Sequence, residues 1–171
     1  MPLLIVFGGL PGSGKTTISR ELARRLSASY IRIDTIEQGL KAAGLAVGAM
    51  GYTIANALAA ENLKLDRTVI ADCVNPVLAS RQGWRDLAQR YHANLVEIET
   101  ICSDLAEHRR RVESRIADLE GLVQPTWQEV MDRAYQPWDR DRLVLDTSGR
   151  PIDGLVDVAE AHIRGCTNIA T

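Results

Sequence analysis

Short apolar runs alternate along the chain with segments in which apolar residues recur at helical spacing. The first run is Leu3–Phe7, and a glycine-rich turn follows it. After the turn, Ile18, Leu22 and Leu26 stand four residues apart, which predicts a strand followed by a helix. Neither an internal repeat nor a Pro/Gly/Ser-rich linker interrupts the alternation. Because such alternation is typical of a parallel sheet covered by helices, we expect one α/β domain over residues 1–171.

The same pattern predicts the other elements. The expected strands are 30–33, 68–71, 95–101 and 143–145, and they are rich in β-branched and other apolar residues. The expected helices are two between 35 and 65 broken near Gly44, one from Asn75-Pro76 to about Tyr91, one opened by Ser103-Asp104, a short one from Pro125-Thr126 through Ala134, and one over 152–163.

The longest uncharged stretch contains Gly44–Ala60. It is shorter than the ~20 residues that cross a membrane, and glycines interrupt it, so we expect it to be buried protein. Ile54, Leu58 and Leu65 are expected on the buried side of its helix. The last residues, 165–171, are expected to be frayed.

Composition sets bounds on the class of protein. The chain has 171 residues, of which 46% are apolar, enough for a single core. Its 20 basic and 22 acidic residues give a net charge of −2, so we expect no general attraction to nucleic acid or to an anionic membrane. The first apolar run lacks the basic flank of a signal peptide or anchor. Cys73, Cys102 and Cys166 lack metal-ligand spacing, which favours a reduced, cytoplasmic protein without disulfides or structural zinc.

The segment GLPGSGKT, Gly9–Thr16, satisfies the phosphate-loop pattern G-x-x-x-x-G-K-[ST] between a predicted strand and a predicted helix. Glycines let successive backbone N–H groups turn inward around phosphate oxygens at the positive end of the next helix. Lys15 would reach the β- and γ-phosphates, and the Thr16 hydroxyl would bind Mg²⁺. We therefore expect ATP and Mg²⁺ as cofactors and the three-layer P-loop NTPase fold with a five-stranded parallel sheet. The residues expected to contact the nucleotide are Gly9, Leu10, Pro11, Gly12, Ser13, Gly14, Lys15, Thr16 and Thr17.

Two aspartates follow predicted strands, Asp34 after the second and Asp72 after the third. In an open parallel sheet the ligand lies outside the carboxyl ends of the strands, so both should face the crevice of the phosphate loop. Asp34 could accept the proton of an attacking hydroxyl, or it could cap the helix that begins at Thr35. Asp72 could hold Mg²⁺ through water or orient the acceptor, or it could cap the turn at Asn75-Pro76.

A cluster of arginines lies on the predicted helix after Asp104. Arg111 and Arg115 are four residues apart and share a helix face, where they could neutralise charge on a transferring phosphoryl group. Acidic residues balance the segment, so a solvated helix held by ion pairs is the alternative. Residues 104–125 are the expected lid region.

The acceptor pocket is expected mainly from the helices between residues 35 and 65. No residue between Lys41 and Glu61 is ionised, which suggests an acceptor of apolar or neutral polar character rather than a second nucleotide. Trp127, Tyr135 and Trp138 could stack on a base or a substrate, although aromatic residues at this spacing are also typical of a core.

The chain resembles the small P-loop kinases, AAA-type ATP-binding proteins that include zeta-toxin-like, chloramphenicol-phosphotransferase-like and polynucleotide-kinase-like members. The resemblance covers most of the chain. It implies that Asp34 is the catalytic base and that Arg111 or Arg115 contacts the phosphates. The motifs that carry it are Gly9–Thr17, Asp34, Val69–Asp72, Cys102–Asp104 with Glu107–Arg111 and Arg115, and Leu143–Thr147.

The chain differs from two kinds of related kinase in the residues that follow the second predicted strand. Polynucleotide kinases usually carry an arginine three residues after the strand-end aspartate, and here that residue is Glu37. Adenylylsulfate kinases carry paired aspartates and an arginine where this chain has Asp34-Thr35-Ile36-Glu37. Both differences weigh against the 5′-hydroxyl of a polynucleotide and against adenylylsulfate as the acceptor.

The leading prediction is an ATP-dependent phosphotransferase that acts on a hydroxyl of a small molecule, with no nucleic-acid or membrane partner. The alternatives are a P-loop ATPase or switch, a 5′-hydroxyl polynucleotide kinase, and a nucleotide-binding module without catalysis. Cys73 stands where motor ATPases usually have a water-activating glutamate, and Asn62–Asp66 does not fit the guanine-reading motif N-K-x-D. Both observations weigh against the ATPase or switch.

Overall fold

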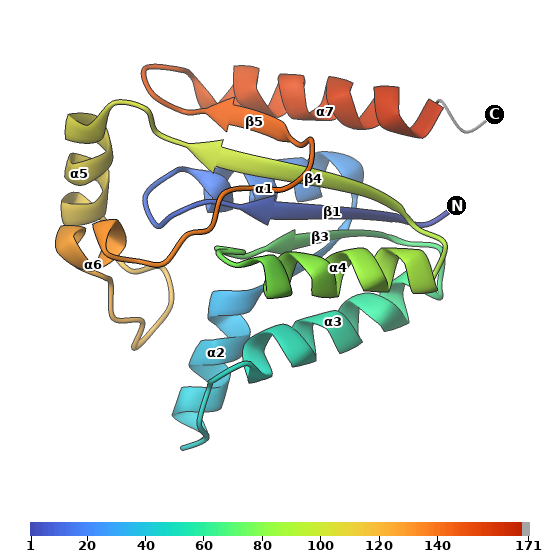
Figure 1. The fold of residues 1–171 in the computed structure, drawn as a ribbon, viewed down its shortest axis with the longest axis horizontal. Coiled ribbons are helices and arrows are strands. Elements are labelled where there is room, and N and C mark those ends of the chain that lie inside the picture. Colours follow the sequence, from blue (N-terminus) through green and yellow to red (C-terminus); the bar gives the residue numbers. More distant parts are fainter. Residues whose placement is uncertain (169–171) are drawn as a thin grey trace.

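The apolar runs form one parallel sheet in the computed structural model, which describes residues 1–168 (Figure 1). Within these residues the sheet has five strands in the order β2-β3-β1-β4-β5, and every pairing is parallel. The predicted α/β fold with a five-stranded parallel sheet is therefore confirmed. The strands are β1 (Leu3–Gly8), β2 (Ser29–Arg32), β3 (Thr68–Asp72), β4 (Asn94–Ile101) and β5 (Leu143–Asp146).

Helices cover both faces of the sheet, because alternate strand residues point to opposite faces and both sets are apolar. On one face Leu4, Val6 and Val69 pack with residues of α3 and α4. On the other face Ile5, Phe7 and Ile70 pack with residues of α1 and α7. The helices are α1 (Lys15–Leu26), α2 (Ile33–Ala42), α3 (Met50–Leu63), α4 (Leu78–Arg90), α5 (Leu105–Ser114), α6 (Trp127–Met131) and α7 (Ile152–Asn168).

The carboxyl ends of the strands meet at one edge of the sheet. Phe7 lies opposite Asp72, and Gly8 lies opposite Glu99, so the loop after β1 emerges between the ends of β3 and β4. In Figure 1 α5 and α6 stand beyond this edge, at the left of the view, and α2 lies below it. The segment 115–125 joins α5 to α6, and we call it the connecting segment.

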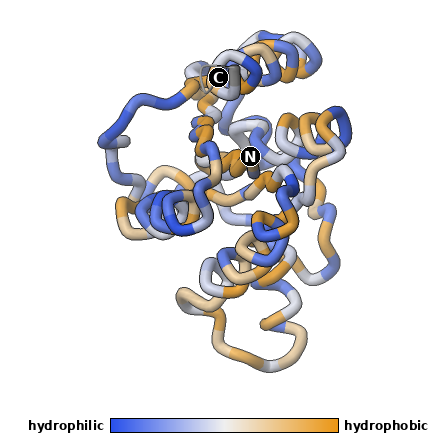
Figure 2. The backbone as a smooth tube through the Cα atoms, turned by 90° about the vertical axis from the view of Figure 1, so that its right-hand side faces the viewer, coloured by the Kyte–Doolittle hydropathy of each residue, from blue (hydrophilic) through white to orange (hydrophobic). Residues whose placement is uncertain are grey.

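The region 44–60 differs from its prediction. Residues 44–49 form a mostly exposed loop, coloured as hydrophobic at the bottom of Figure 2, so this part of the stretch is not buried. In α3 the buried residues before Leu63 are small and include Gly51, Ala55 and Ala59, whereas Leu58 is exposed. Leu65, beyond the helix, is exposed too. A Cβ at Gly51 would lie 2.7 Å from Glu37 Cγ, so small residues are what allow α3 to approach its neighbours closely.

Several helix boundaries also differ. Asp104 caps α5 as predicted, accepting hydrogen bonds from the N–H groups of Ala106 and Glu107. The capping box of Thr126 and Glu129 opens α6, which ends at Met131 rather than at Ala134. The final helix extends through Asn168, so residues 165–168 are helical rather than frayed, and 169–171 lie outside the described residues. None of the described helices combines the length and apolarity needed to span a membrane.

Candidate active site

The phosphate loop connects β1 directly to α1. Gly14 occupies the N-cap position of α1 in the left-handed region (φ 88°), and no side chain caps the helix. The N–H groups of the first turn are therefore available to an anion at the positive end of the helix dipole. Two other N–H groups are used inside the protein, because Gly9 donates to the Val74 carbonyl (3.0 Å) and Ser13 donates to the Leu10 carbonyl (3.2 Å).

Helix α5 packs against this loop at Gly12. Gly12 has φ +82°, and a Cβ there would lie 2.7 Å from Val112 Cγ2 and 3.1 Å from His108 Cδ2. His108 Nε2 lies 2.8 Å from the Pro11 carbonyl oxygen. Because a carbonyl only accepts, Nε2 is the donor and the ring carries its proton there. The loop and α5 therefore form one packed unit.

A first cleft of about 520 Å³ opens beside the loop. Its lining contains five of the nine residues that were predicted to contact the nucleotide, together with both predicted arginines. The remaining four contacts lie elsewhere: Pro11 lines a second cleft, while Gly9, Leu10 and Ser13 line a separate cavity against β4. Ser13 Oγ lies 2.8 Å from Thr100 Oγ1, so these residues shape the loop from behind. The first cleft is lined by Gly12, Gly14, Lys15, Thr16, Thr17, Arg20, Arg111, Ser114, Arg115, Ile116, Asp118 and Ile152.

Lys15 is the link between the first and second clefts, since it lines both. Only 5% of the residue is exposed, and its Nζ donates to the Leu10 carbonyl at 3.4 Å. Burial lowers the pKa of Lys15, while the carboxylates of Asp72 and Asp34 act in the opposite direction. Their effect places both predicted carboxylates within electrostatic reach of the ammonium group.

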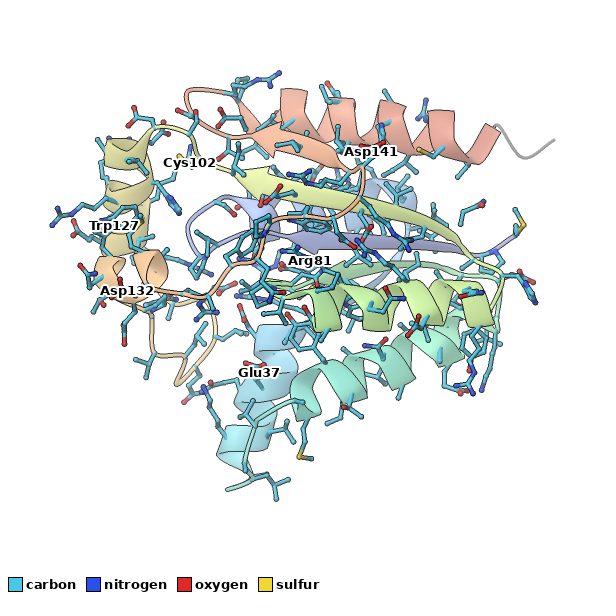
Figure 3. The ribbon with its side chains drawn as sticks, in the orientation of Figure 1. Glu37, Arg81, Cys102, Trp127, Asp132 and Asp141 are labelled. Atoms are coloured by element: carbon cyan, nitrogen blue, oxygen red, sulfur yellow. The ribbon has the colours of Figure 1, made fainter. Side chains whose placement is uncertain are left out.

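The second cleft, of about 220 Å³, lies next to the first and is lined by charged side chains of both signs. Glu37, labelled on α2 in Figure 3, has its pKa raised by burial and by the neighbouring Asp34. Within 35–65 only Glu37, Lys41 and Tyr52 line this cleft. The lining of this cleft is therefore charged rather than apolar or neutral, and the connecting segment supplies much of its wall. An acceptor pocket built mainly by 35–65 stays a prediction.

Asp34 faces the second cleft, but its place in the fold differs from the prediction. Strand β2 ends at Arg32, so Asp34 lies in the first turn of α2. The N-cap position belongs to Arg32 and lacks a side-chain hydrogen bond, which excludes Asp34 as the cap. Asp34 Oδ2 instead accepts a hydrogen bond from Arg32 Nη2 at 3.2 Å. About a third of the Asp34 side chain is exposed.

Asp72 ends β3 as predicted but lies deeper than Asp34. The residue is 2% exposed and is absent from the linings of the first and second clefts. Its Oδ2 accepts a hydrogen bond from the Tyr30 hydroxyl at 2.6 Å rather than from the turn at Asn75-Pro76. Burial, together with the Asp72 charge, raises the pKa of Tyr30.

The two predicted arginines have different surroundings. Arg111 donates to Thr147 Oγ1 (2.7 Å), to the Thr147 carbonyl (2.9 Å) and to Glu107 (2.6 Å). Arg115 is the C-cap residue after α5 and has an extended backbone, so it does not share a helix face with Arg111 as predicted. It lines both the first and the second cleft. The alternative of a solvated ion-pair helix does describe Arg109, which pairs with Glu113 on the exposed face. Arg115 is thus the arginine best placed between the two clefts.

The three aromatic residues that were considered for stacking are half-buried and absent from the linings of the first and second clefts: Trp127, Tyr135 and Trp138. Trp138 packs on the guanidinium of Arg81, 4.2 Å from the ring centre, and Arg81 is labelled in Figure 3. Tyr135 donates to Glu99 at 3.0 Å. Trp127 meets His108 edge-on, with ring centres 5.2 Å apart. These contacts favour the packing interpretation over stacking on a substrate.

Three charged residues at or next to the site were not predicted from the sequence: Arg20, Arg32 and Asp118. Asp118 accepts hydrogen bonds from Arg20 (2.6 Å) and from Arg32 (2.7 Å). Arg32 did carry a signal, because a charge at the end of an apolar strand and two residues before Asp34 is unusual in a buried sheet. Asp118 carried none, since its partners are 86 and 98 residues away.

A family model described as an AAA domain matches residues 4–137, which is more than half of the chain. The chain belongs to the AAA-domain family. The matched part of this AAA domain contains the phosphate loop, both candidate carboxylates and the arginines of α5, and it ends before β5. The chain is thus a small P-loop kinase-like protein, as the sequence resemblance predicted.

Solved structures share the fold of this AAA domain. An APS kinase of Mycobacterium tuberculosis in complex with AMPPNP and APS is 19% identical, with a TM-score of 0.73 over 95% of this chain and 98% of that one. A gluconokinase from Sinorhizobium meliloti is 20% identical, with a TM-score of 0.68 over 98% and 95%. A sugar kinase from Janibacter is 17% identical, with a TM-score of 0.66 over 100% and 99%. A search of the curated proteins found no match.

Proposed function

We propose that this protein is an ATP-dependent kinase that transfers the γ-phosphoryl group of ATP to a hydroxyl of a small, polar acceptor. The observation that carries the proposal is the adjacency of two clefts that share Lys15 and Arg115. The first cleft offers the loop and the N-terminus of α1 to a triphosphate. The second offers Asp34 to a hydroxyl.

The transfer would occur where the two clefts meet. Asp34 accepts the proton of the acceptor hydroxyl as the acceptor oxygen bonds to the γ-phosphorus. The bond from that phosphorus to the bridging oxygen breaks, and ADP is the leaving group. Lys15 and Arg115 neutralise charge on the moving group, and the buried Lys15 acts strongly there because little water screens it.

Thr16 and Asp72 would hold Mg²⁺. The Thr16 hydroxyl in the first turn of α1 and the buried Asp72 carboxylate at the end of β3 are oxygen donors of the kind that Mg²⁺ prefers. Mg²⁺ commonly keeps several waters and uses few protein ligands. When bound, Mg²⁺ neutralises charge on the phosphate oxygens. Asp72 is buried, lines neither cleft and accepts a hydrogen bond from Tyr30, so a water-mediated role suits it better than direct contact.

The lining of the second cleft supports a polar acceptor. Asp34 and Glu37 are three residues apart on α2 and can accept hydrogen bonds from hydroxyls. Lys41 and Arg133 add positive charge on the same cleft. Their charges counteract the rise in the Glu37 pKa. Hydroxyl-rich molecules, including those that carry a carboxylate or a phosphate, fit this mixture better than apolar ones. Two similar structures are those of a gluconokinase and a sugar kinase, which agrees with this choice.

Consumption of ATP with Mg²⁺ tests the proposal when it is measured with and without pooled acceptors. The pools are sugars and sugar acids, aminoglycoside and amphenicol antibiotics, UDP-sugars, and 5′-hydroxyl oligonucleotides. We expect consumption that depends on one pool and disappears in Lys15→Ala. Lys64→Ala is the matched control, because Lys64 pairs with Glu61 on an exposed helix end. Consumption that no pool changes would refute the kinase and favour an ATPase or switch.

A further inference from the structure

Arg32 is a buried cation that contacts the carboxylates of the site without lining either cleft. Its side chain is 2% exposed, and three carboxylates surround it. Asp118 takes two of its hydrogen bonds, at 2.7 and 3.2 Å, and Asp34 takes one, at 3.2 Å. Asp72 lies 3.9 Å from Nε. A buried guanidinium needs such partners, because an uncompensated charge is costly in a low-dielectric interior.

One nitrogen of Arg32 is shared between two carboxylates. Nη2 donates both to Asp34 Oδ2 and to Asp118 Oδ1. The orientation of Asp34 therefore depends on how firmly Asp118 holds the guanidinium. Among the described residues no hydrogen bond involves Asp34 Oδ1, which leaves that oxygen for an acceptor hydroxyl.

Asp118 also ties the connecting segment to the sheet. It lies in that segment, 32% of its side chain is exposed, and it bonds to Arg20 of α1 as well as to Arg32. The same segment supplies walls to both clefts, with Arg115 and Ile116 on the first and Leu122 to Pro125 on the second. Arg115 Nη2 lies 4.0 Å from Asp118 Oδ1. The Asp118 contacts thus fix the segment relative to α1 and to Arg32, the partner of Asp34.

We propose that Arg32 and Asp118 are positioning residues for phosphoryl transfer. Their ion pair fixes the orientation of Asp34 and holds the connecting segment against the sheet. The proposal rests on the proposed function, because it assigns Asp34 the role of base. Its physical basis is geometric, since an error of about 1 Å in the position of a reacting group can cost up to about 10²-fold in rate.

Loss of the Asp118 charge should redirect Arg32. In Asp118→Asn the guanidinium loses its paired carboxylate and turns to Asp34, which brings both oxygens of Asp34 into the ion pair. The oxygen that serves the acceptor is then occupied. We expect kcat for transfer to fall about tenfold or more at saturating ATP and acceptor. Asp118 is preferred to Arg32 for the test, because a substitution of the buried Arg32 could prevent folding.

A double-mutant cycle with Asp34→Asn distinguishes positioning from a general structural role. If Asp118 acts through Asp34, Asp118→Asn should change the residual transfer of Asp34→Asn by less than about twofold. Transfer of labelled phosphate at enzyme excess makes this low rate measurable. Asp157→Asn is the matched control: it removes an exposed carboxylate that pairs with Arg25 at 2.6 Å on the outer surface, and it should leave kcat unchanged.

The outcomes separate the two proposals. Losses that add in the double variant, or a kcat of Asp118→Asn within twofold of the wild type, would overturn the positioning role while leaving the kinase intact. A wild-type protein that transfers no phosphoryl group to any acceptor would refute the proposed function, and the positioning role with it. A tenfold or greater loss that vanishes in the Asp34→Asn background supports both.

Discussion

Replacing Gly12 by alanine tests whether α5 is held in place by its contact with the phosphate loop. The new Cβ would lie 2.7 Å from Val112 Cγ2 and 3.1 Å from His108 Cδ2. Both neighbours are buried, Val112 at 5% and His108 at 5% exposure, so neither can move away freely. The substitution therefore has to displace the loop or α5.

The cost has two parts. A non-glycine residue in the left-handed region costs about 1–2 kcal/mol, partly offset by about 0.4–1 kcal/mol from the smaller entropy of the unfolded chain. Overpacking a buried contact adds about 1–3 kcal/mol. We expect a net loss of about 3 kcal/mol in the free energy of unfolding. For a domain of this size that lowers Tm by roughly 6–12 °C.

Thermal unfolding followed by circular dichroism measures this loss. Gly83→Ala is the matched control, since a Cβ at Gly83 meets no atom within 4 Å, and alanine in a helix should be neutral or stabilising. In Gly12→Ala with Val112→Ala the steric part should be recovered, so the double variant should lose less than the sum of the two single losses. A Gly12→Ala protein with an unchanged Tm, or fully additive losses, would refute the packing of α5 on the loop.

Three further predictions use the charges of the site. Lys15→Met should raise Tm without nucleotide at neutral pH while abolishing transfer. Burial lowers the pKa of Lys15, so the unfolded chain binds the proton more strongly than the folded protein, and charged Lys15 destabilises the fold. A lower Tm of Lys15→Met than of the wild type, measured by calorimetry, would contradict this. Arg115→Ala should lower kcat more than it weakens ATP binding, as steady-state kinetics beside titration calorimetry can show. Hydrogen bonds from Arg32 hold the Asp118 pKa below its ordinary 3.8, so its stabilisation exists above that pH and is lost as pH falls through the folded pKa. The stability difference between wild type and Asp118→Asn, measured by urea unfolding, should therefore shrink between pH 6 and about pH 3, and a constant difference would contradict the ion pair.

Local chemistry could be predicted from the sequence. The glycines of the phosphate loop, Lys15 and Thr16 lie close together in the sequence, so the motif predicts the shape of the loop directly. Asp104 is predicted as a helix cap because aspartate is a preferred N-cap residue. The strands were predictable because they are short segments rich in β-branched and other apolar residues.

Contacts between distant segments could not be predicted. The Arg32–Asp118 pair joins a strand end to the connecting segment 86 residues away, and neither residue has a local pattern. The buried face of α3 was missed because hydrophobicity favours Leu58, whereas close helix packing selects small residues such as Ala55. The charged lining of the second cleft was missed because it comes from segments on both sides of the uncharged region.

Direct detection of the product tests the central claim most closely. Protein, Mg²⁺ and ATP labelled in the γ-phosphate are incubated with the acceptor pool that stimulates consumption, and the labelled product is followed for wild type and Asp34→Asn. The account predicts one label on the acceptor for each ADP formed, with transfer in Asp34→Asn reduced by about 10²–10⁴-fold and ATP affinity unchanged. Label released only as inorganic phosphate, or transfer by Asp34→Asn at the wild-type rate, would contradict it.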